Sequence, residues 1–277
     1  MRGNFELKEK GVGIFDSGVG GLTVAREIMK LLPHEKIVYL GDTARLPYGN
    51  KSPETITNFS SQALRFFLRQ DVKLIVVACN TVSALSLEAL RQNSPLPLIG
   101  VLKPGARKGV KVTRNRIIGI IGTKATINSR AYSRFIKSLD PGIKVVSKSC
   151  PLLVPLVEEG WLRNKTTYDV VSFYLKPLLR QGIDTLILGC THYPLLKDVF
   201  QRVTGKGVIL VDSAQEVAKE VKKILQGKNI QRESSSPPHH HFFVSDSPQK
   251  FARIAKLFLG KEIINSLQKI NLEDESV

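Results

Sequence analysis

The chain has 277 residues, 42% of them hydrophobic, and a formal net charge of +17. This length and composition provide a full core for one large or two small domains, and no apolar run is long enough to cross a bilayer. Because residues 1–10 also lack the apolar core of a signal peptide, we expect a soluble, cytoplasmic protein that does not interact with a membrane.

Short apolar runs alternate with amphipathic stretches along the chain. The runs predict strands at 12–15, 37–40, 74–78, 98–101, 117–121, 144–147, 185–188, 208–211 and 241–245. Helical spacing of apolar residues predicts helices at 22–32, 53–68, 168–180, 213–225 and 248–259. Ser52 and Pro53 mark the start of the second helix, and Pro177 is expected to kink or end the third. This alternation predicts an α/β fold built on a mostly parallel sheet flanked by helices.

The two halves of the chain resemble each other. Residues 12–18, VGIFDSG, match residues 118–124, IGIIGTK, in position and pattern. Cys79 and Cys190 lie at nearly the same separation as these two segments. The repetition predicts two similar α/β domains, joined near residues 101–114. Residues 271–277 are expected to be frayed.

Cys79 and Cys190 each follow a buried-type apolar run and precede small polar residues. Open α/β sheets bind ligands at the carboxyl ends of their strands, so both thiols are expected at such a site. One thiol acting as base and the other as acid could move protons on both faces of one carbon. Either cysteine alone would be interpreted as a small buried hydrophobic residue, but the equivalence of the two positions favours function. Cys150 has no counterpart and is predicted to be structural, and three cysteines argue against a disulfide framework.

Polar residues beside the two thiols are candidates for substrate binding. His192 could assist proton transfer or orient the substrate, or it could be an ordinary hydrogen-bonded loop histidine. Asp16, with Ser17 beside it, could bind a substrate ammonium group and tune a thiol, or it could cap the next helix. The hydroxyl and amide groups suited to a carboxylate are those of Asn80, Thr81 and Thr191. The turn formed by Pro47, Tyr48 and Gly49 could line the pocket or be an ordinary turn.

Three other kinds of site fit the sequence less well. A dinucleotide site is not expected, because Thr23 stands where the last glycine of G-x-G-x-x-G would be. A metal site made by Cys79, Cys190 and His192 lacks the usual ligand spacing, so no metal is expected. A thiol hydrolase with Cys190 as nucleophile and His192 as base would leave Cys79 unexplained.

The basic charge is strongest between Lys103 and Arg116, a stretch without acidic residues. Such charge can indicate nucleic-acid binding or attraction of an anionic substrate. We interpret it as a solvated basic surface, because no recognised nucleic-acid motif is present and no aromatic residues are interleaved with the basic ones. Nucleic-acid contact therefore stays open but is not favoured.

Five segments, in this order, resemble those of bacterial glutamate racemases. They are GIFDSGVGGLTV (13–24), YLGDTARLPYG (39–49), ACNTVSA (78–84), GTKATINS (122–129) and LGCTHYPLL (188–196). The resemblance covers most of the chain, from about residue 12 to residue 212. It implies two α/β domains with the active site between them. The first would comprise 1–102 completed by 213–277, and the second 103–212.

The resemblance also implies an activity. It implies cofactor-independent interconversion of L- and D-glutamate, which supplies D-glutamate for peptidoglycan, by a homodimer. The alternative within the same class is an aspartate racemase or a related two-thiol isomerase. By resemblance, Cys79 would act on D-glutamate and Cys190 on L-glutamate, with Asp16 and His192 assisting.

Further site residues follow from the matched motifs. Glu158, in CPLLVPLVEEG (150–160), matches a pocket-side glutamate of the family and is a third candidate assistant in catalysis. The implied substrate-binding positions are Asp16, Ser17, Pro47, Tyr48, Gly49, Asn80, Thr81, Thr123, Thr126, Thr191 and His192.

Overall fold

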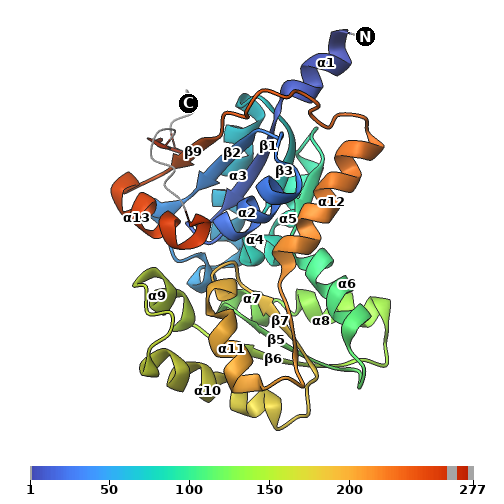
Figure 1. Cartoon of the computed structure of the whole chain (residues 1–277), viewed down its shortest axis with the longest axis vertical. Helices are drawn as coiled ribbons and strands as arrows, with labels where there is room; N and C mark the ends of the chain where they lie inside the picture. The colour runs from blue at the N-terminus through green and yellow to red at the C-terminus, as the bar shows by residue number, and fades with distance from the viewer. Residues whose placement is uncertain (1, 261–266, 274–277) are drawn as a thin grey trace.

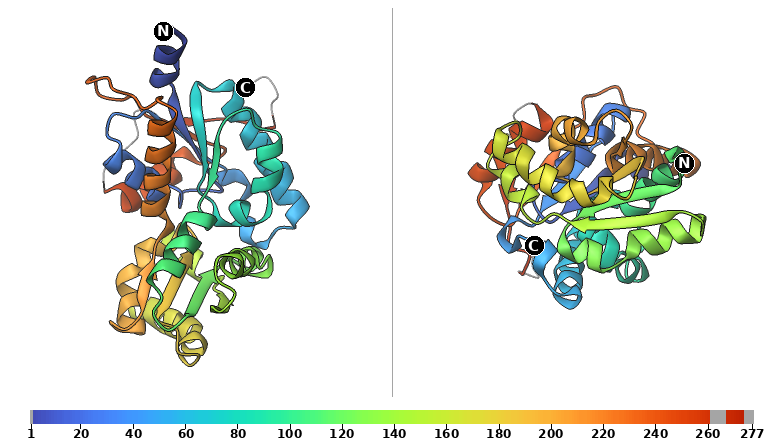
Figure 2. Two further views of the ribbon diagram at one scale, coloured as in Figure 1. Left: turned by 90° about the vertical axis from the view of Figure 1, so that its right-hand side faces the viewer. Right: turned by 90° about the horizontal axis from the view of Figure 1, so that it is seen from below.

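The computed structural model describes residues 2–260 and 267–273 and contains two parallel sheets flanked by helices (Figures 1 and 2). Every strand pairing between described residues is parallel. This confirms the predicted α/β class. In Figure 1, one sheet occupies the upper half of the molecule and the other the lower half.

The upper sheet, sheet A, has the strand order β10-β9-β2-β1-β3-β4. Its strands are β1 (Gly11–Asp16), β2 (Ile37–Gly41), β3 (Val72–Val77), β4 (Leu98–Gly100), β9 (His241–Val244) and β10 (Leu267–Lys269). The helical elements around it are α1 (Arg2–Glu9), α2 (Leu22–Leu31), η1 (Thr43–Arg45), η2 (Tyr48–Asn50), α3 (Pro53–Arg69), α4 (Asn80–Leu85), α5 (Leu87–Gln92), α12 (Ser213–Gly227) and α13 (Pro248–Leu259). Strands β1, β2 and β3 are buried along their whole length, as parallel strands covered on both faces must be.

The lower sheet, sheet B, has the order β6-β5-β7-β8. Its strands are β5 (Ile117–Gly122), β6 (Lys144–Ser149), β7 (Thr185–Gly189) and β8 (Ile209–Val211). The helices that belong to this part of the chain are α6 (Leu102–Val112), α7 (Lys124–Asn128), α8 (Ala131–Leu139), α9 (Leu153–Glu158), α10 (Lys165–Leu179), η3 (Tyr193–Leu196) and α11 (Lys197–Thr204).

The two sheets share one arrangement of strands. The order β2-β1-β3-β4 in sheet A corresponds to β6-β5-β7-β8 in sheet B, with β1 and β5 at equivalent central positions. The similarity predicted from residues 12–18 and 118–124 is therefore present in the fold. Cys79 follows β3 and Cys190 follows β7, so the two thiols stand at equivalent strand ends.

The C-terminal part of the chain returns to sheet A. Strand β9 pairs with β2, and α12 packs against α2 of the upper half as well as α6 (Figure 1). The boundaries 1–102 with 213–277 and 103–212 stay a prediction, because α12 contacts helices on both sides of the proposed boundary.

The helix predicted at 168–180 begins three residues earlier, at Lys165, and continues past Pro177. Helix α10 starts after Asn164, whose side chain accepts a hydrogen bond from the Thr167 amide, and runs to Leu179. Pro177 lies in its last turn, so it neither ends the helix at that residue nor divides it. Of the segment expected to be frayed, 271–273 has no strand or helix and 274–277 lies outside the described residues.

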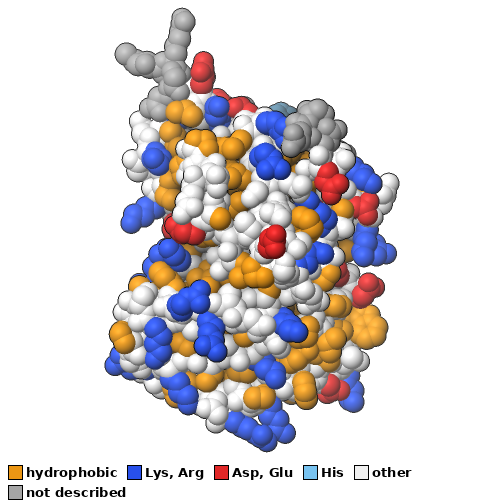
Figure 3. Space-filling view, turned by 180° about the vertical axis from the view of Figure 1, so that it is seen from behind, with side chains coloured by type: hydrophobic (Ala, Val, Ile, Leu, Met, Phe, Trp, Pro, Cys, Tyr) orange, Lys and Arg blue, Asp and Glu red, His pale blue; other side chains and the backbone are white. Residues whose placement is uncertain are grey.

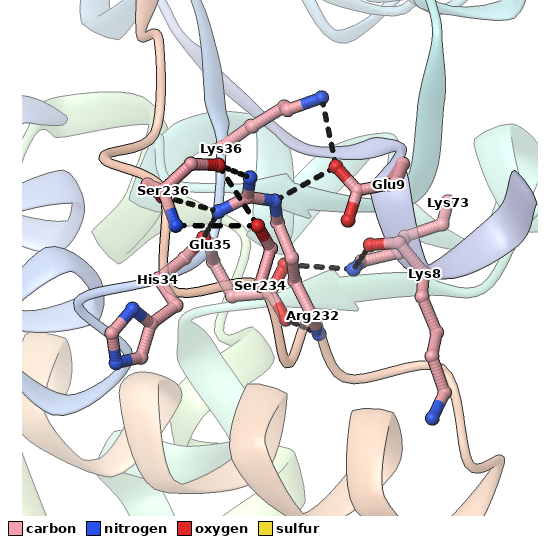
Figure 4. A network of polar contacts seen from close by, with 9 residues as sticks. All are labelled: Lys8, Glu9, His34, Glu35, Lys36, Lys73, Arg232, Ser234 and Ser236. Carbon is pink, nitrogen blue, oxygen red and sulfur yellow. Dashed lines mark hydrogen bonds and ion pairs between the residues drawn. The ribbon is translucent and has the colours of Figure 1, made fainter. Parts of the chain in front are cut away.

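A buried polar network lies at the amino-terminal ends of the strands of sheet A (Figure 4). Lys73 Nζ lies 2.7 Å from Glu35 Oε2, and both side chains are almost completely buried. The Glu35 carboxylate also accepts a hydrogen bond from the backbone amide of Arg232. Arg232 in turn donates to Glu9 and to the His34 carbonyl. The network joins α1, the starts of β2 and β3, and the segment after α12.

The surface is rich in basic side chains. Figure 3 shows Lys and Arg scattered over one face of both halves, with fewer acidic side chains among them. Within the Lys103 to Arg116 stretch, Arg107 pairs with Glu220 and Arg116 with Asp140, so part of this charge is neutralised. No helix among residues 2–260 and 267–273 is long and apolar enough to cross a membrane.

Candidate active site

Both thiols lie in buried surroundings between the two halves. Cys79 is 5% exposed and Cys190 is 7% exposed. Burial, together with the nearby charges of Asp16 and Cys190, raises the pKa of Cys79 to about 12. Because its pKa is raised, Cys79 holds its proton at neutral pH, and its thiol donates a hydrogen bond to Ser17 Oγ at 3.5 Å.

Cys190 begins a line of hydrogen-bonding groups that ends at a carboxylate. Its Sγ lies 3.8 Å from His192 Nδ1, and His192 Nε2 lies 3.1 Å from Glu158 Oε1. Burial alone would lower the pKa of His192, but its contacts with Cys190 and Glu158 outweigh burial and raise the pKa to about 10. Burial would likewise raise the pKa of Glu158, but the hydrogen bond and charge of His192 lower it. The imidazolium so formed lies beside the Cys190 thiol.

Asp16 ends β1 and connects the two cysteine turns. Its Oδ2 accepts a hydrogen bond from the Gly18 amide at 3.0 Å, and its Oδ1 accepts one from Thr191 Oγ1 at 3.4 Å. Burial raises the pKa of this carboxyl group, against the opposing charge of His192. The structure therefore brings Asp16 and Ser17 to the Cys79 side and Thr191 and His192 to the Cys190 side of one site.

Three threonine hydroxyls form a cluster across the two halves. Thr81 Oγ1 lies 2.9 Å from Thr123 Oγ1 and 3.2 Å from Thr126 Oγ1, which are themselves 2.9 Å apart. Thr123 caps the start of α7, because its hydroxyl oxygen accepts a hydrogen bond from the Thr126 amide. Hydroxyls can donate as well as accept, so this cluster could bind an anionic group. Thr123 and Thr126, which only the family resemblance implied, thus lie beside Thr81, which was predicted from the donor capacity of its hydroxyl group.

The turn at 47–49 reaches the site mainly through its backbone. A Cβ at Gly49 would lie 2.6 Å from Thr123 Cβ, so this backbone packs directly against the threonine cluster. The Tyr48 hydroxyl donates to Asp42, and the ring is buried against Phe15 and Phe59. Pro47 is exposed. Gly49 is therefore the residue through which this turn packs against another predicted site residue, Thr123.

Sequence reasoning missed three residues that complete the site. Tyr132, on α8, donates a hydrogen bond to Asn80 Oδ1 at 2.7 Å. Thr23 donates to the Thr191 carbonyl at 3.2 Å. A Cβ at Gly20 would lie 2.5 Å from His192 Nδ1, so only glycine allows this approach. Thr23 and Gly20 belong to the quoted GIFDSGVGGLTV motif, whereas nothing in the sequence distinguishes Tyr132 from a core residue of an amphipathic helix.

In the part of the chain that the structure describes, no group of three or more His, Cys, Asp or Glu side chains is arranged so that it could hold a metal ion. The expectation that the protein needs neither metal nor cofactor stays a prediction.

The arrangement can support proton transfer on two sides of a bound molecule. One side has a protonated thiol, and the other has a thiol beside an imidazolium and a carboxylate. Hydroxyl and amide donors from both halves lie between α4 and α7, where they could hold an anionic substrate.

The chain is similar to known proteins over most of its length. The Asp/Glu/Hydantoin racemase family model matches residues 22–221. A glutamate racemase from Geobacter metallireducens is 51% identical over 96% of this chain and 98% of its own length.

Two solved structures are similar over nearly the whole fold. A glutamate racemase isoform from Bacillus anthracis is 43% identical, with a TM-score of 0.92 over 96% of this chain and 98% of its own. The glutamate racemase of Francisella tularensis, solved in complex with D-glutamate, is 36% identical, with a TM-score of 0.90 over 96% of this chain and 99% of its own. The chain therefore belongs to the glutamate racemase family, within the wider group of Asp/Glu/hydantoin racemases.

Proposed function

We propose that the protein interconverts L- and D-glutamate by a two-thiol mechanism that uses no cofactor. The observation that supports it most is the placement of Cys79 and Cys190 at equivalent strand ends, in buried but electrically different surroundings. Racemisation needs this difference, because one group must begin as base and the other as acid.

Conversion of L-glutamate would begin at Cys190. Its thiolate, stabilised by the His192 imidazolium, removes the α-proton, and the protonated Cys79 delivers its own proton to the opposite face. Cys190 is then a thiol and Cys79 a thiolate, which is the starting state for D-glutamate. Asp16 raises the pKa of Cys79 and so helps to keep this thiol protonated before the substrate reacts. Glu158 has an indirect part, because it keeps His192 charged.

The remaining site residues would bind the substrate. Asp16, with Ser17 beside it, would bind the substrate ammonium group. Asn80 and Thr191 would bind a substrate carboxylate. The threonine cluster of Thr81, Thr123 and Thr126, with the backbone of the 47–49 turn beside it, suits the other carboxylate. Burial strengthens each of these contacts.

In the cell, the activity would supply D-glutamate for peptidoglycan from a cytoplasmic location. The homodimer is proposed from the family resemblance, and light scattering on the purified protein would test it. Nucleic-acid binding remains a prediction that we do not favour. Binding to mixed-sequence DNA that falls steeply with added salt would reveal an electrostatic contact.

A substrate panel tests the proposed activity. Dialysed protein is incubated separately with each enantiomer of glutamate and of aspartate, and the products are separated on a chiral column. We expect conversion of both glutamate enantiomers and little conversion of aspartate. Faster conversion of aspartate would instead support the alternative, an aspartate racemase or related two-thiol isomerase.

Cysteine variants test the assignment of the two bases. Cys79→Ser and Cys190→Ser should each lower the rate of racemisation by about a thousandfold, because each removes one of two acid–base groups. Cys150→Ser is the matched control, since Cys150 is also buried but its Sγ donates its hydrogen bond to the Lys148 carbonyl and not to a site residue. Full racemisation by either site variant would refute the two-thiol assignment.

A further inference from the structure

Tyr132 connects the two cysteine turns without being part of either. Its side chain is 2% exposed and comes from the first turn of α8, in the sheet B half. Its hydroxyl donates to Oδ1 of Asn80, the residue after Cys79. Its ring packs over Gly189, the residue before Cys190, where an added Cβ would lie 3.4 Å from Tyr132 Cε2. One side chain therefore contacts a neighbour of each thiol.

Local hydrogen bonds fix where this tyrosine lies. Ser129 Oγ donates a hydrogen bond to the Thr126 carbonyl at 2.7 Å and accepts one from the Ala131 amide at 3.1 Å. These bonds connect the end of α7, which carries Thr126, to the start of α8. The position of Tyr132 is thus set by the same turn that holds the threonine cluster.

The bond to Asn80 determines which end of the amide faces the site. Burial raises the pKa of Tyr132, so its hydroxyl stays protonated and acts as a donor. Because Oδ1 of Asn80 accepts the hydrogen bond from Tyr132, the two N–H donors on Nδ2 are directed elsewhere. An amide held in this way presents donors to a carboxylate, whereas a freely rotating amide presents an acceptor for part of the time.

We propose that Tyr132 is a positioning residue for racemisation: it orients the Asn80 amide toward a substrate carboxylate across the boundary between the two halves. The inference rests on the proposed function and extends it to substrate binding. Asn80 would hold the carboxylate throughout the reaction, so Tyr132 should affect substrate binding more than the chemical step.

Tyr132→Phe removes the hydroxyl and keeps the ring. We expect the KM for both glutamate enantiomers to rise about five- to tenfold, as the loss of one buried hydrogen bond would cause, with kcat changed by less than about twofold. Tyr174→Phe is the matched control, because Tyr174 is a second buried tyrosine of the same half, on α10. An unchanged KM in Tyr132→Phe would overturn the inference.

A double-mutant cycle separates positioning from general support of the fold. If Tyr132 acts through Asn80, adding Tyr132→Phe to Asn80→Ala should change KM by less than about twofold, although it changes KM severalfold in the wild-type background. If the KM of the double variant instead rises by the product of the increases in the two single variants, Tyr132 acts independently of Asn80, and the proposal is refuted.

The same cycle can be followed without turnover. The rise in melting temperature caused by added glutamate reports binding, and it also shows whether each variant is folded. A wild-type protein that binds glutamate but does not racemise it would count against the proposed function alone. An active wild-type protein whose Tyr132→Phe variant gains as much stability from glutamate would count against the role of Tyr132 alone.

Discussion

The two thiols occupy equivalent strand ends but have different neighbours. Burial and the charge of Asp16 raise the pKa of Cys79, which lies beside Ser17, whereas Cys190 has an imidazolium 3.8 Å away. Equivalent positions give the two-faced geometry, and the different neighbours give the two thiols different electrostatic surroundings. The enantiomer assignment implied by family resemblance, with Cys190 acting on L-glutamate, agrees with this difference.

Glu158 should control stability as well as charge in the site. The pKa of His192 is raised to about 10, well above its ordinary value, so the charged pair stabilises the folded protein fully below about pH 6.5. That contribution declines as the pH rises through about 10. Glu158→Gln should therefore lower the free energy of unfolding by about 2 kcal/mol near pH 6, and by progressively less toward pH 10.

Thermal unfolding of Glu158→Gln and wild type between pH 6 and pH 10 measures this difference. Glu159→Gln is the control, because Glu159 is the adjacent residue and is exposed. A difference between wild type and Glu158→Gln that stays constant over this pH range would mean that His192 does not depend on Glu158 for its charge.

At the scale of elements, the loop between β1 and α2 packs against the turn after β7. A Cβ at Gly20 would lie 2.3 Å from Thr191 Oγ1 and 2.5 Å from His192 Nδ1. Gly20→Ala should push the His192 ring from its place and lower kcat/KM by about a hundredfold. Gly227→Ala, at the end of α12 with nothing within 4 Å, should leave kcat/KM unchanged. Equal activity of the two variants would contradict the described packing.

Most of the strands were predictable because parallel strands covered on both faces need short, wholly apolar runs, whereas the three-residue strand β10 was not predicted. Cys79 and Cys190 were identified by their position after two such runs. Tyr132 and the contact of Glu158 with His192 could not be derived from residue patterns, because both depend on how distant segments meet. The short helices α4 and α9 also went unpredicted, since six residues are too few to show helical periodicity.

At the scale of the whole molecule, the candidate site and a buried polar network lie at opposite ends of the strands of sheet A. Cys79 lies at the carboxyl end of β3, and the Lys73–Glu35–Arg232 network lies at the amino-terminal ends of the strands (Figure 4). Lys73→Met leaves a buried carboxylate without its cation and should lower the free energy of unfolding by about 3 kcal/mol. The kcat below the melting temperature should not change.

Lys10→Met provides the matched control for Lys73→Met. Lys10 pairs with Asp71 at 3.2 Å, but the Lys10 side chain is partly exposed and that of Asp71 is exposed, so loss of this pair should cost less than about 1 kcal/mol. Chemical denaturation measures both variants. A loss of stability no larger for Lys73→Met than for Lys10→Met would show that the buried network does not hold this edge of the sheet.

The central claim is that two different groups move the proton, one on each face of the α-carbon. L-glutamate is incubated with the protein in D2O, and deuterium is measured early in the reaction in the D-glutamate formed and in the L-glutamate recovered. We predict deuterium at the α-carbon of essentially all D-glutamate and little in the recovered L-glutamate, because the group that removes a proton is not the group that delivers one. D-glutamate that keeps the original α-hydrogen would contradict the account, since it would require a single group to carry the proton from one face to the other.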